Sequence, residues 1–125
     1  MKLEFLPSGS PDCPLLRLFD FDCLQVTQFR DLRLELAVGQ RETFAMPHDF
    51  PVDPTAGYQL KMKCADTPNG IRQISSSAFE CVLTRTDWDN IAWLVDPFCQ
   101  SEREGYQWLV KTGRISLLLS HDETW

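Results

Sequence analysis

Residues 78–99, AFECVLTRTDWDNIAWLVDPFC, predict one strand that passes directly into one helix, and the rest of the fold is inferred outward from this unit. Residues 79–83 are apolar except for Glu80, which is typical of a strand covered on both faces. Such a strand has neighbours on both sides, so we expect it at the centre of a sheet.

The second part of the stretch predicts a helix that begins near Thr86 and ends at Val95 or Asp96. Thr86 is placed to cap the first turn, and Asp89 three residues later resembles the acidic member of a capping box. The apolar positions after the cap form a single stripe, at Trp88, Ile91, Ala92 and Val95. Pro97 cannot donate to the helical hydrogen-bond ladder, which sets the predicted end.

The chain before this unit predicts a strand and a second helix. Residues 1–14 become rich in proline and are expected to form a loosely attached arm, whereas residues 15–21 alternate as a strand. Residues 24–38 fit a helix that stops at Gly39, and their last part, residues 32–38, also fits a strand. The content of Leu, Arg, Glu and Gln favours the helix.

Shorter patterns between the two predicted helices indicate more strands. Residues 42–46 fit a short edge strand, and residues 47–54 hold three prolines, which predicts a surface loop. Residues 57–65 alternate as a half-buried antiparallel strand, and residues 71–74 are expected to pair back on it after an Asn-Gly turn.

The last part of the chain completes the predicted fold. Residues 106–110 and 115–120 form a hairpin around Gly113. The whole order predicts a single α+β domain over residues 1–125, a sandwich with two helices on one face of a mostly antiparallel sheet. Its element order is ferredoxin-like, βαββαβ, with an added C-terminal hairpin. The sequence shows no internal repeat.

Composition limits the class of protein. The chain has 125 residues, 43% of them hydrophobic, and a net charge of −6, which fits one compact acidic domain. Its best basic cluster, Arg30, Arg33 and Arg41, is interleaved with acids, so we expect a solvated mixed-charge face and no nucleic-acid binding. No apolar run approaches the ~18 residues of a membrane span, and we expect a cytoplasmic protein with no membrane contact.

The cysteines and histidines do not form a recognisable metal or catalytic motif. The five cysteines are scattered and odd in number, which favours reduced thiols: Cys13, Cys23, Cys64, Cys81 and Cys99. No CxxC, HxxxH or HExxH spacing occurs, and no glycine-rich phosphate loop. We therefore predict no cofactor and no catalytic residue. The weak metal candidates are His48, Cys99 and His121, with Cys13 as a further possible ligand.

Trp93 is the residue that the predicted core does not explain. It lies about 140° round the helix from Trp88, so it faces outward if Trp88 faces the core. Tryptophan is a preferred anchor of protein interfaces. The predicted partner-binding residues are Trp93, Asp89, Asp96, Trp108 and Trp125. The opposing interpretation is that the loop at 100–106 or the C-terminal tail covers Trp93.

The leading hypothesis is a small non-enzymatic domain that acts through a protein partner or self-association. The alternative is a protein that binds a metal or a small ligand under the 47–54 loop, through His48, Asp49 and a nearby cysteine. One version of this alternative is a cysteine/histidine-dependent enzyme.

Overall fold

The fold contains two helices and eight strands in the part of the chain that the structure describes. The computed structural model describes residues 1–125 except positions 9, 10, 12, 13, 47, 51–56, 101–104, 112 and 122–125. The elements follow one another as β1 (Lys2–Leu6), β2 (Leu15–Phe19), α1 (Cys23–Ala37), β3 (Thr43–Met46), β4 (Gln59–Cys64), β5 (Gly70–Gln73), β6 (Ala78–Leu83), α2 (Arg85–Gln100), β7 (Tyr106–Val110) and β8 (Ser116–Ser120).

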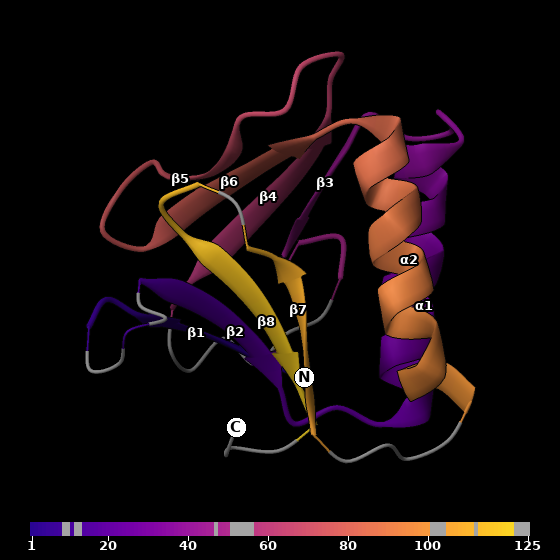
Figure 1. Ribbon diagram of the computed structural model, residues 1–125, viewed down its shortest axis with the longest axis horizontal. Coiled ribbons are helices and arrows are strands. Elements are labelled where there is room, and N and C mark those ends of the chain that lie inside the picture. Colours follow the sequence, from indigo (N-terminus) through magenta and orange to yellow (C-terminus); the bar gives the residue numbers. More distant parts are fainter. Residues whose placement is uncertain are drawn as a thin grey trace.

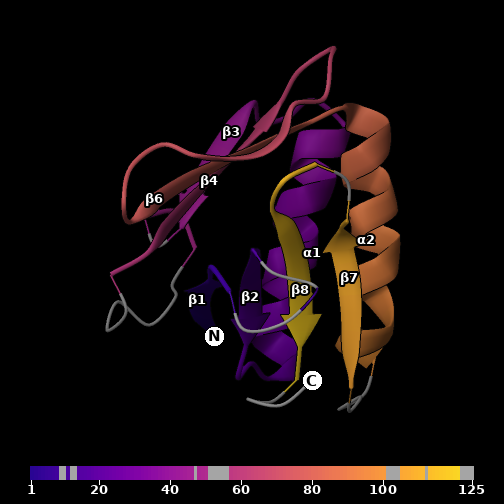
Figure 2. The same ribbon diagram turned by 60° about the vertical axis from the view of Figure 1, so that its left-hand side comes forward.

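The strands form two separate mixed sheets. Their orders are β1-β2-β8-β7 and β3-β4-β6-β5. In each sheet the two central strands run parallel, and each edge strand is antiparallel to its neighbour. Figure 1 shows α1 and α2 side by side along one flank of both sheets, and Figure 2 shows the same pairing from another direction.

The chain consists of two halves, each with the element order ββαββ, and an approximate two-fold symmetry relates them. The first half contains β1, β2, α1, β3 and β4, and the second contains β5, β6, α2, β7 and β8. Each half gives its first two strands to one sheet and its last two strands to the other. Exchanging the halves therefore converts the order of one sheet into the order of the other.

The strand register repeats as well. Leu16 of β2 pairs with Leu117 of β8, and Phe79 of β6 pairs with Leu60 of β4 at the equivalent position. All four residues are buried. The antiparallel edge pairs repeat in the same way, apart from a bulge between Trp108 and Val110 in β7.

The inner faces of the two helices also match. Their buried positions recur at a constant separation along the chain. The equivalent pairs are Val26 and Trp88, Phe29 and Ile91, Arg33 and Val95, and Leu36 and Phe98. Every pair differs in residue type, so the halves share a burial pattern without sequence similarity. This explains why no repeat is visible in the sequence.

The local sequence explains where α1 begins, and the prediction of a helix at residues 24–38 is confirmed. Asp22 forms a capping box with Gln25: the Gln25 N–H donates to Asp22 Oδ1 at 2.8 Å, and the Asp22 N–H donates to Gln25 Oε1 at 3.1 Å. This pair satisfies two backbone donors that a helix start leaves open.

Helix α2 starts earlier and ends later than predicted. Its capping box is formed by Thr84 and Asp87, because the Asp87 N–H donates to Thr84 Oγ1 at 3.2 Å and Asp87 Oδ2 accepts from the Thr84 N–H at 3.1 Å. Pro97 does not end the helix, which continues to Gln100. The buried ring of Phe98 lies against Phe21, and this packing holds the last turn in place.

The predicted fold class was only partly right. The protein is α+β with two helices, but the ferredoxin-like order is wrong because the strands form two sheets rather than one. Residues 71–74 were expected to pair with the strand at residues 57–65, which is β4. Instead, β5 pairs with β6. The interior position of β6, the edge position of β3 and the β7–β8 hairpin are confirmed.

The predicted N-terminal arm begins as a strand. Lys2–Leu6 pairs with β2, and the side chains of Met1 and Leu3 are buried. Most of the expected 47–54 surface loop lies outside the described residues, but Phe50 within it is buried at 2% exposure. One hydrophobic cluster includes residues from both sheets and both helices.

Candidate functional site

The candidate site is a groove between the outer faces of α1 and α2. The two helices run antiparallel, and an ion pair joins them where Arg30 Nη1 lies 2.6 Å from Asp96 Oδ1. The hydrogen bond to Asp96 raises the pKa of Arg30, so this cation stays charged. We call the space of about 290 Å³ above this ion pair the helix-pair groove; it is lined by Arg30, Leu34, Asp89, Ala92, Trp93 and Asp96.

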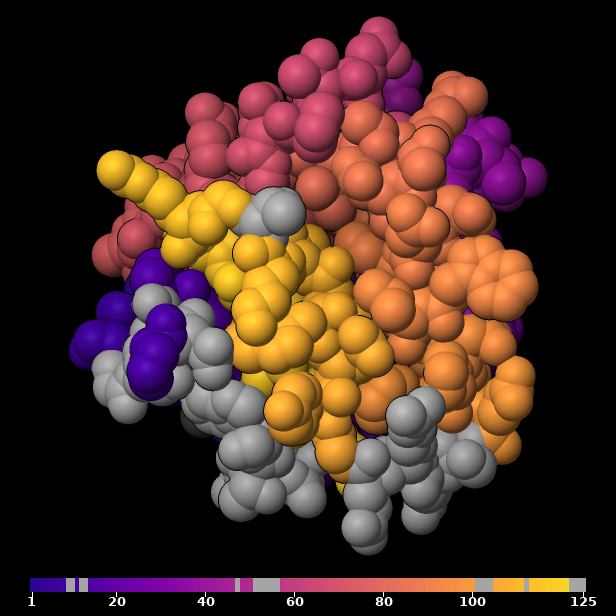
Figure 3. Space-filling view, viewed as in Figure 1, coloured from indigo at the N-terminus to yellow at the C-terminus, as the bar shows by residue number. Residues whose placement is uncertain are grey.

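Trp93 forms the most exposed apolar wall of the helix-pair groove. It is 72% exposed, and Leu34 of α1, which lines the same groove, is 37% exposed. Trp88 is 0% exposed, so the two tryptophans face opposite ways, as their spacing predicts. Figure 3 shows the outer surface of α2, in orange, along one side of the molecule.

The charges around the groove are mostly negative. Arg30 is shared between Asp96 and Asp31, whose Oδ1 lies 3.2 Å from Arg30 Nη2. Asp96 also accepts a hydrogen bond from Gln100 at 2.9 Å. Asp89 has no ion-pair partner among the described residues. The groove therefore offers an indole ring beside an uncompensated carboxylate.

The five predicted partner-binding residues do not all meet. Asp89, Trp93 and Asp96 lie together in the helix-pair groove. Trp108 lies on β7 outside this groove, and the Lys111 ammonium sits 4.8 Å from the centre of its ring. Trp125 lies outside the described residues.

The weak metal candidates have separate surroundings. His48 Nδ1 lies 3.0 Å from Asp49 Oδ1, the His121 ring packs on Phe21, and the Cys99 thiol donates to the Val95 carbonyl. Within the described ranges, no three His, Cys, Asp or Glu side chains form a group that could hold a metal ion. Cys13 lies outside those ranges.

The Asp49 carboxylate instead has a structural role. Its Oδ2 accepts from the Ala45 N–H at 2.8 Å, and this bond, followed by the one from His48, lowers the pKa of Asp49. The charged form is therefore held at the end of β3. The Ala45–Asp49 hydrogen bond therefore ties Asp49 to β3.

Arg33 was placed with Arg30 and Arg41 on a solvated face, and this prediction is wrong. Arg33 is 0% exposed, and its guanidinium lies 3.6 Å from the centre of the Phe29 ring and 4.2 Å from that of Phe44. Burial lowers the pKa of Arg33 well below its ordinary value. The sequence does hold a signal for this burial, because Arg33 falls on the same helical stripe as the buried residues Val26, Phe29 and Leu36.

Comparisons with models of protein families, with curated proteins and with solved structures find no match to this chain. Neither of the described helices is long and apolar enough to cross a lipid bilayer.

Proposed function

We propose that the chain is a small non-enzymatic domain that binds a protein partner through the helix-pair groove. The observation that supports this most strongly is Trp93, a large apolar side chain that is 72% exposed on an ordered helix. Buried tryptophans supply much of the binding energy in protein interfaces, because they bury a large area with few rotatable bonds. Leu34 extends the apolar surface beside it.

Charge complementarity indicates the chemistry of the partner. The whole chain carries a net charge of −6, and Asp89, which lines the groove with Trp93, has no ion-pair partner among the described residues because Arg30 pairs with Asp96 and Asp31. A second copy of the chain would bring a like charge to the groove. We therefore propose a polypeptide partner in which an apolar side chain is flanked by Lys or Arg. The expected cytoplasmic location and lack of nucleic-acid binding belong to the same proposal.

A peptide-display selection on the immobilised parent protein tests the proposal, and the selected peptides are then measured on both the parent and the variant Trp93→Ala. We expect enrichment of peptides that carry an apolar residue next to Lys or Arg. Their affinity, measured by fluorescence anisotropy, should fall about 30-fold or more in Trp93→Ala, as for an interface hot spot. It should also fall as salt is added, because exposed charges are screened.

Leu24→Ala is the matched control. Leu24 is 67% exposed on α1 but does not line the helix-pair groove, so its loss should change the affinity less than twofold. Both variants should keep the melting temperature of the parent. Selected peptides that bind Trp93→Ala as tightly as the parent would refute the docking role. A dimer in sedimentation equilibrium that Trp93→Ala dissociates would show that the partner is a second copy.

A further inference from the structure

The two-fold relation between the halves implies two equivalent clefts, one beside each helix. Beside α1, the connection from β3 to β4 carries Phe50, whose ring lies 6.0 Å from the Phe29 ring at an angle of 75°. Phe50 is 2% exposed, so its ring fills this position. A hollow of about 390 Å³ remains on the outer side of this ring; its lining includes Gln28, Leu32 and Phe50 itself.

The equivalent cleft beside α2 is open. The connection from β7 to β8 spans residues 111–115, whereas the one from β3 to β4 spans residues 47–58, so the second half has a much shorter loop here. A cleft of about 480 Å³ remains between α2, β7 and the β5–β6 edge. Its wall includes Asn90, Ile91 and Leu94, which are the counterparts of Gln28, Phe29 and Leu32.

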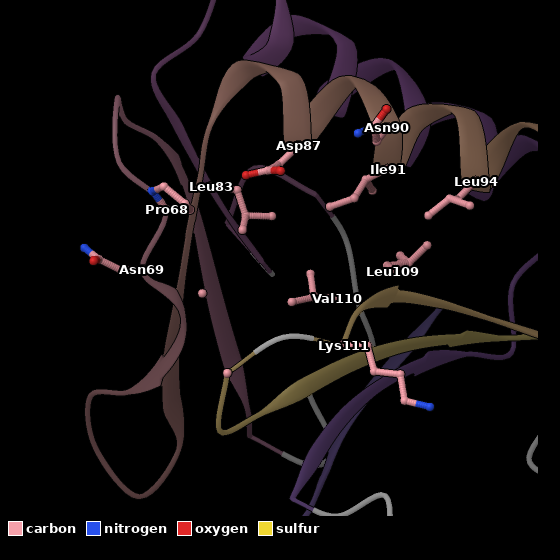
Figure 4. A pocket seen from close by; sticks show the side chains of 12 residues that line it. Pro68, Asn69, Leu83, Asp87, Asn90, Ile91, Leu94, Leu109, Val110 and Lys111 are labelled. Carbon is pink, nitrogen blue, oxygen red and sulfur yellow. The ribbon is translucent and has the colours of Figure 1, made fainter.

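The inner wall of the α2 cleft is apolar. Leu83 of β6, Ile91 and Leu94 of α2, and Leu109 and Val110 of β7 line it (Figure 4). Figure 4 also shows that the side chains from α2 and from β7 point toward one another across the space. An aromatic ring placed here would meet apolar atoms of α2 and of β7, and its contact with Ile91 would correspond to that of Phe50 with Phe29.

One end of the α2 cleft is negative. The Asp87 side chain points from α2 into the cleft (Figure 4). Its Oδ2 accepts hydrogen bonds from the N–H and the hydroxyl of Thr84. Its other oxygen, Oδ1, has no hydrogen bond to a described residue. The Lys111 side chain points away from the cleft, with its ammonium over the Trp108 ring. Lys111, the cationic side chain that lines the cleft, therefore does not neutralise Asp87.

We propose that the α2 cleft binds a small aromatic molecule that carries a positively charged amine. The ring takes the position that Phe50 fills in the other half, and the ammonium binds the free oxygen of Asp87. The cleft volume of about 480 Å³ falls within the range of small-molecule pockets, about 300–1,000 Å³. This site uses a different face of α2 from the helix-pair groove and does not depend on the proposed protein partner.

Three related probes separate the two parts of the proposal: 2-phenylethylamine, the neutral ethylbenzene and the anionic 3-phenylpropionate. In NMR titrations of the parent protein, we expect 2-phenylethylamine to shift resonances of Ile91, Leu94 and Val110. Ethylbenzene should bind more weakly at the same place, and 3-phenylpropionate should not bind. A set of shifts elsewhere, or no shifts at millimolar probe, would overturn the site.

Two variants test the named contacts. Asp87→Asn keeps an acceptor for Thr84, so the helix cap remains. It should lower the affinity for 2-phenylethylamine about tenfold and leave the affinity for ethylbenzene unchanged. Leu94→Trp should fill the cleft and abolish binding of both; Leu94 is only partly buried, so the fold tolerates the change. Equal binding of 2-phenylethylamine to the parent and to Asp87→Asn would refute the ion pair. Trp93→Ala should bind the probes like the parent, which separates this site from the docking surface.

Discussion

Replacing Arg33 with methionine is expected to stabilise the protein. Arg33 is 0% exposed, and its Nε, Nη1 and Nη2 atoms have no hydrogen-bond partner among the described residues. The equivalent position of α2 holds Val95, which is also buried and has no charge to bury. Methionine keeps an unbranched chain of similar reach between the rings of Phe29 and Phe44 while removing the charge.

The expected gain follows from two opposing free energies. Burying an ion without a partner costs several kcal/mol even after the protein relaxes. The guanidinium regains part of this from the rings, because a desolvated cation–π contact contributes about 2 kcal/mol and its carbon lies 3.6 Å and 4.2 Å from the centres of Phe29 and Phe44. Replacing buried charges by apolar side chains has stabilised proteins by about 1–4 kcal/mol, and we expect a gain in this range.

Urea and thermal unfolding measure the gain. For a domain of this size, the melting temperature should rise by roughly 5–15 °C. The urea midpoint should rise without a change in slope, because the surface exposed on unfolding stays the same. Arg33→Lys should instead destabilise, since it keeps a charge in the core and loses the stacking of a flat guanidinium on the rings.

Arg17→Met is the matched control. Arg17 is 5% exposed and packs on the Phe19 ring in the same way, but it forms an ion pair with Glu4. Its replacement should lower the free energy of unfolding by about 1–3 kcal/mol, because Glu4 then loses its partner. Loss of stability in Arg33→Met comparable to that in Arg17→Met would refute the view that the Arg33 charge is a net cost.

Three further predictions concern the core and the helix end. Burial raises the pKa of the Cys81 thiol from 9.0 to about 12, so the unfolded chain releases this proton first. Stability should therefore fall by about 1.4 kcal/mol per pH unit above about pH 9, and urea unfolding of Cys81→Ala should lack this part of the slope. Pro97→Ala should raise the melting temperature, because it restores the backbone N–H that proline lacks inside α2; an unchanged or lower value contradicts this. Phe50→Ala should cost about 3–5 kcal/mol in thermal unfolding, and added ethylbenzene should raise the melting temperature of Phe50→Ala more than that of the parent, because it also fills the vacated space; an equal rise in both contradicts this.

The local elements could be predicted because each has its own signal in the sequence. The apolar run of residues 79–83 indicated an interior strand, and the composition of residues 24–38 favoured a helix over a strand. The end of α2 could not be predicted in this way. Pro97 is a local signal for a helix end, but the burial of Phe98 against Phe21 continues the helix, and this contact joins residues far apart in the chain.

The division of the strands into two sheets could not be read from the sequence either. The parallel pairs β2–β8 and β4–β6 each join a strand of one half to a strand of the other, and side-chain alternation within a strand does not identify its neighbour. The two-fold relation was hidden for a related reason. Equivalent positions such as Arg33 and Val95 share burial and not residue type.

The candidate site was predicted in part. Helical spacing placed Trp93 outward with Asp89 and Asp96, and the structure brings these three together in one groove. The contribution of α1 was missed, because Arg30 and Leu34 reach the groove only through the packing of the two helices. The open α2 cleft was missed because it depends on a comparison of two loop lengths across the two-fold relation.

An NMR titration with the tightest selected peptide shows whether a protein partner docks on the helix-pair groove. If it does, the Trp93 indole N–H and the Leu34 methyl groups should shift together and saturate at one peptide per chain. Shifts confined to Leu109 and Val110 in the α2 cleft, with Trp93 unchanged, would contradict it.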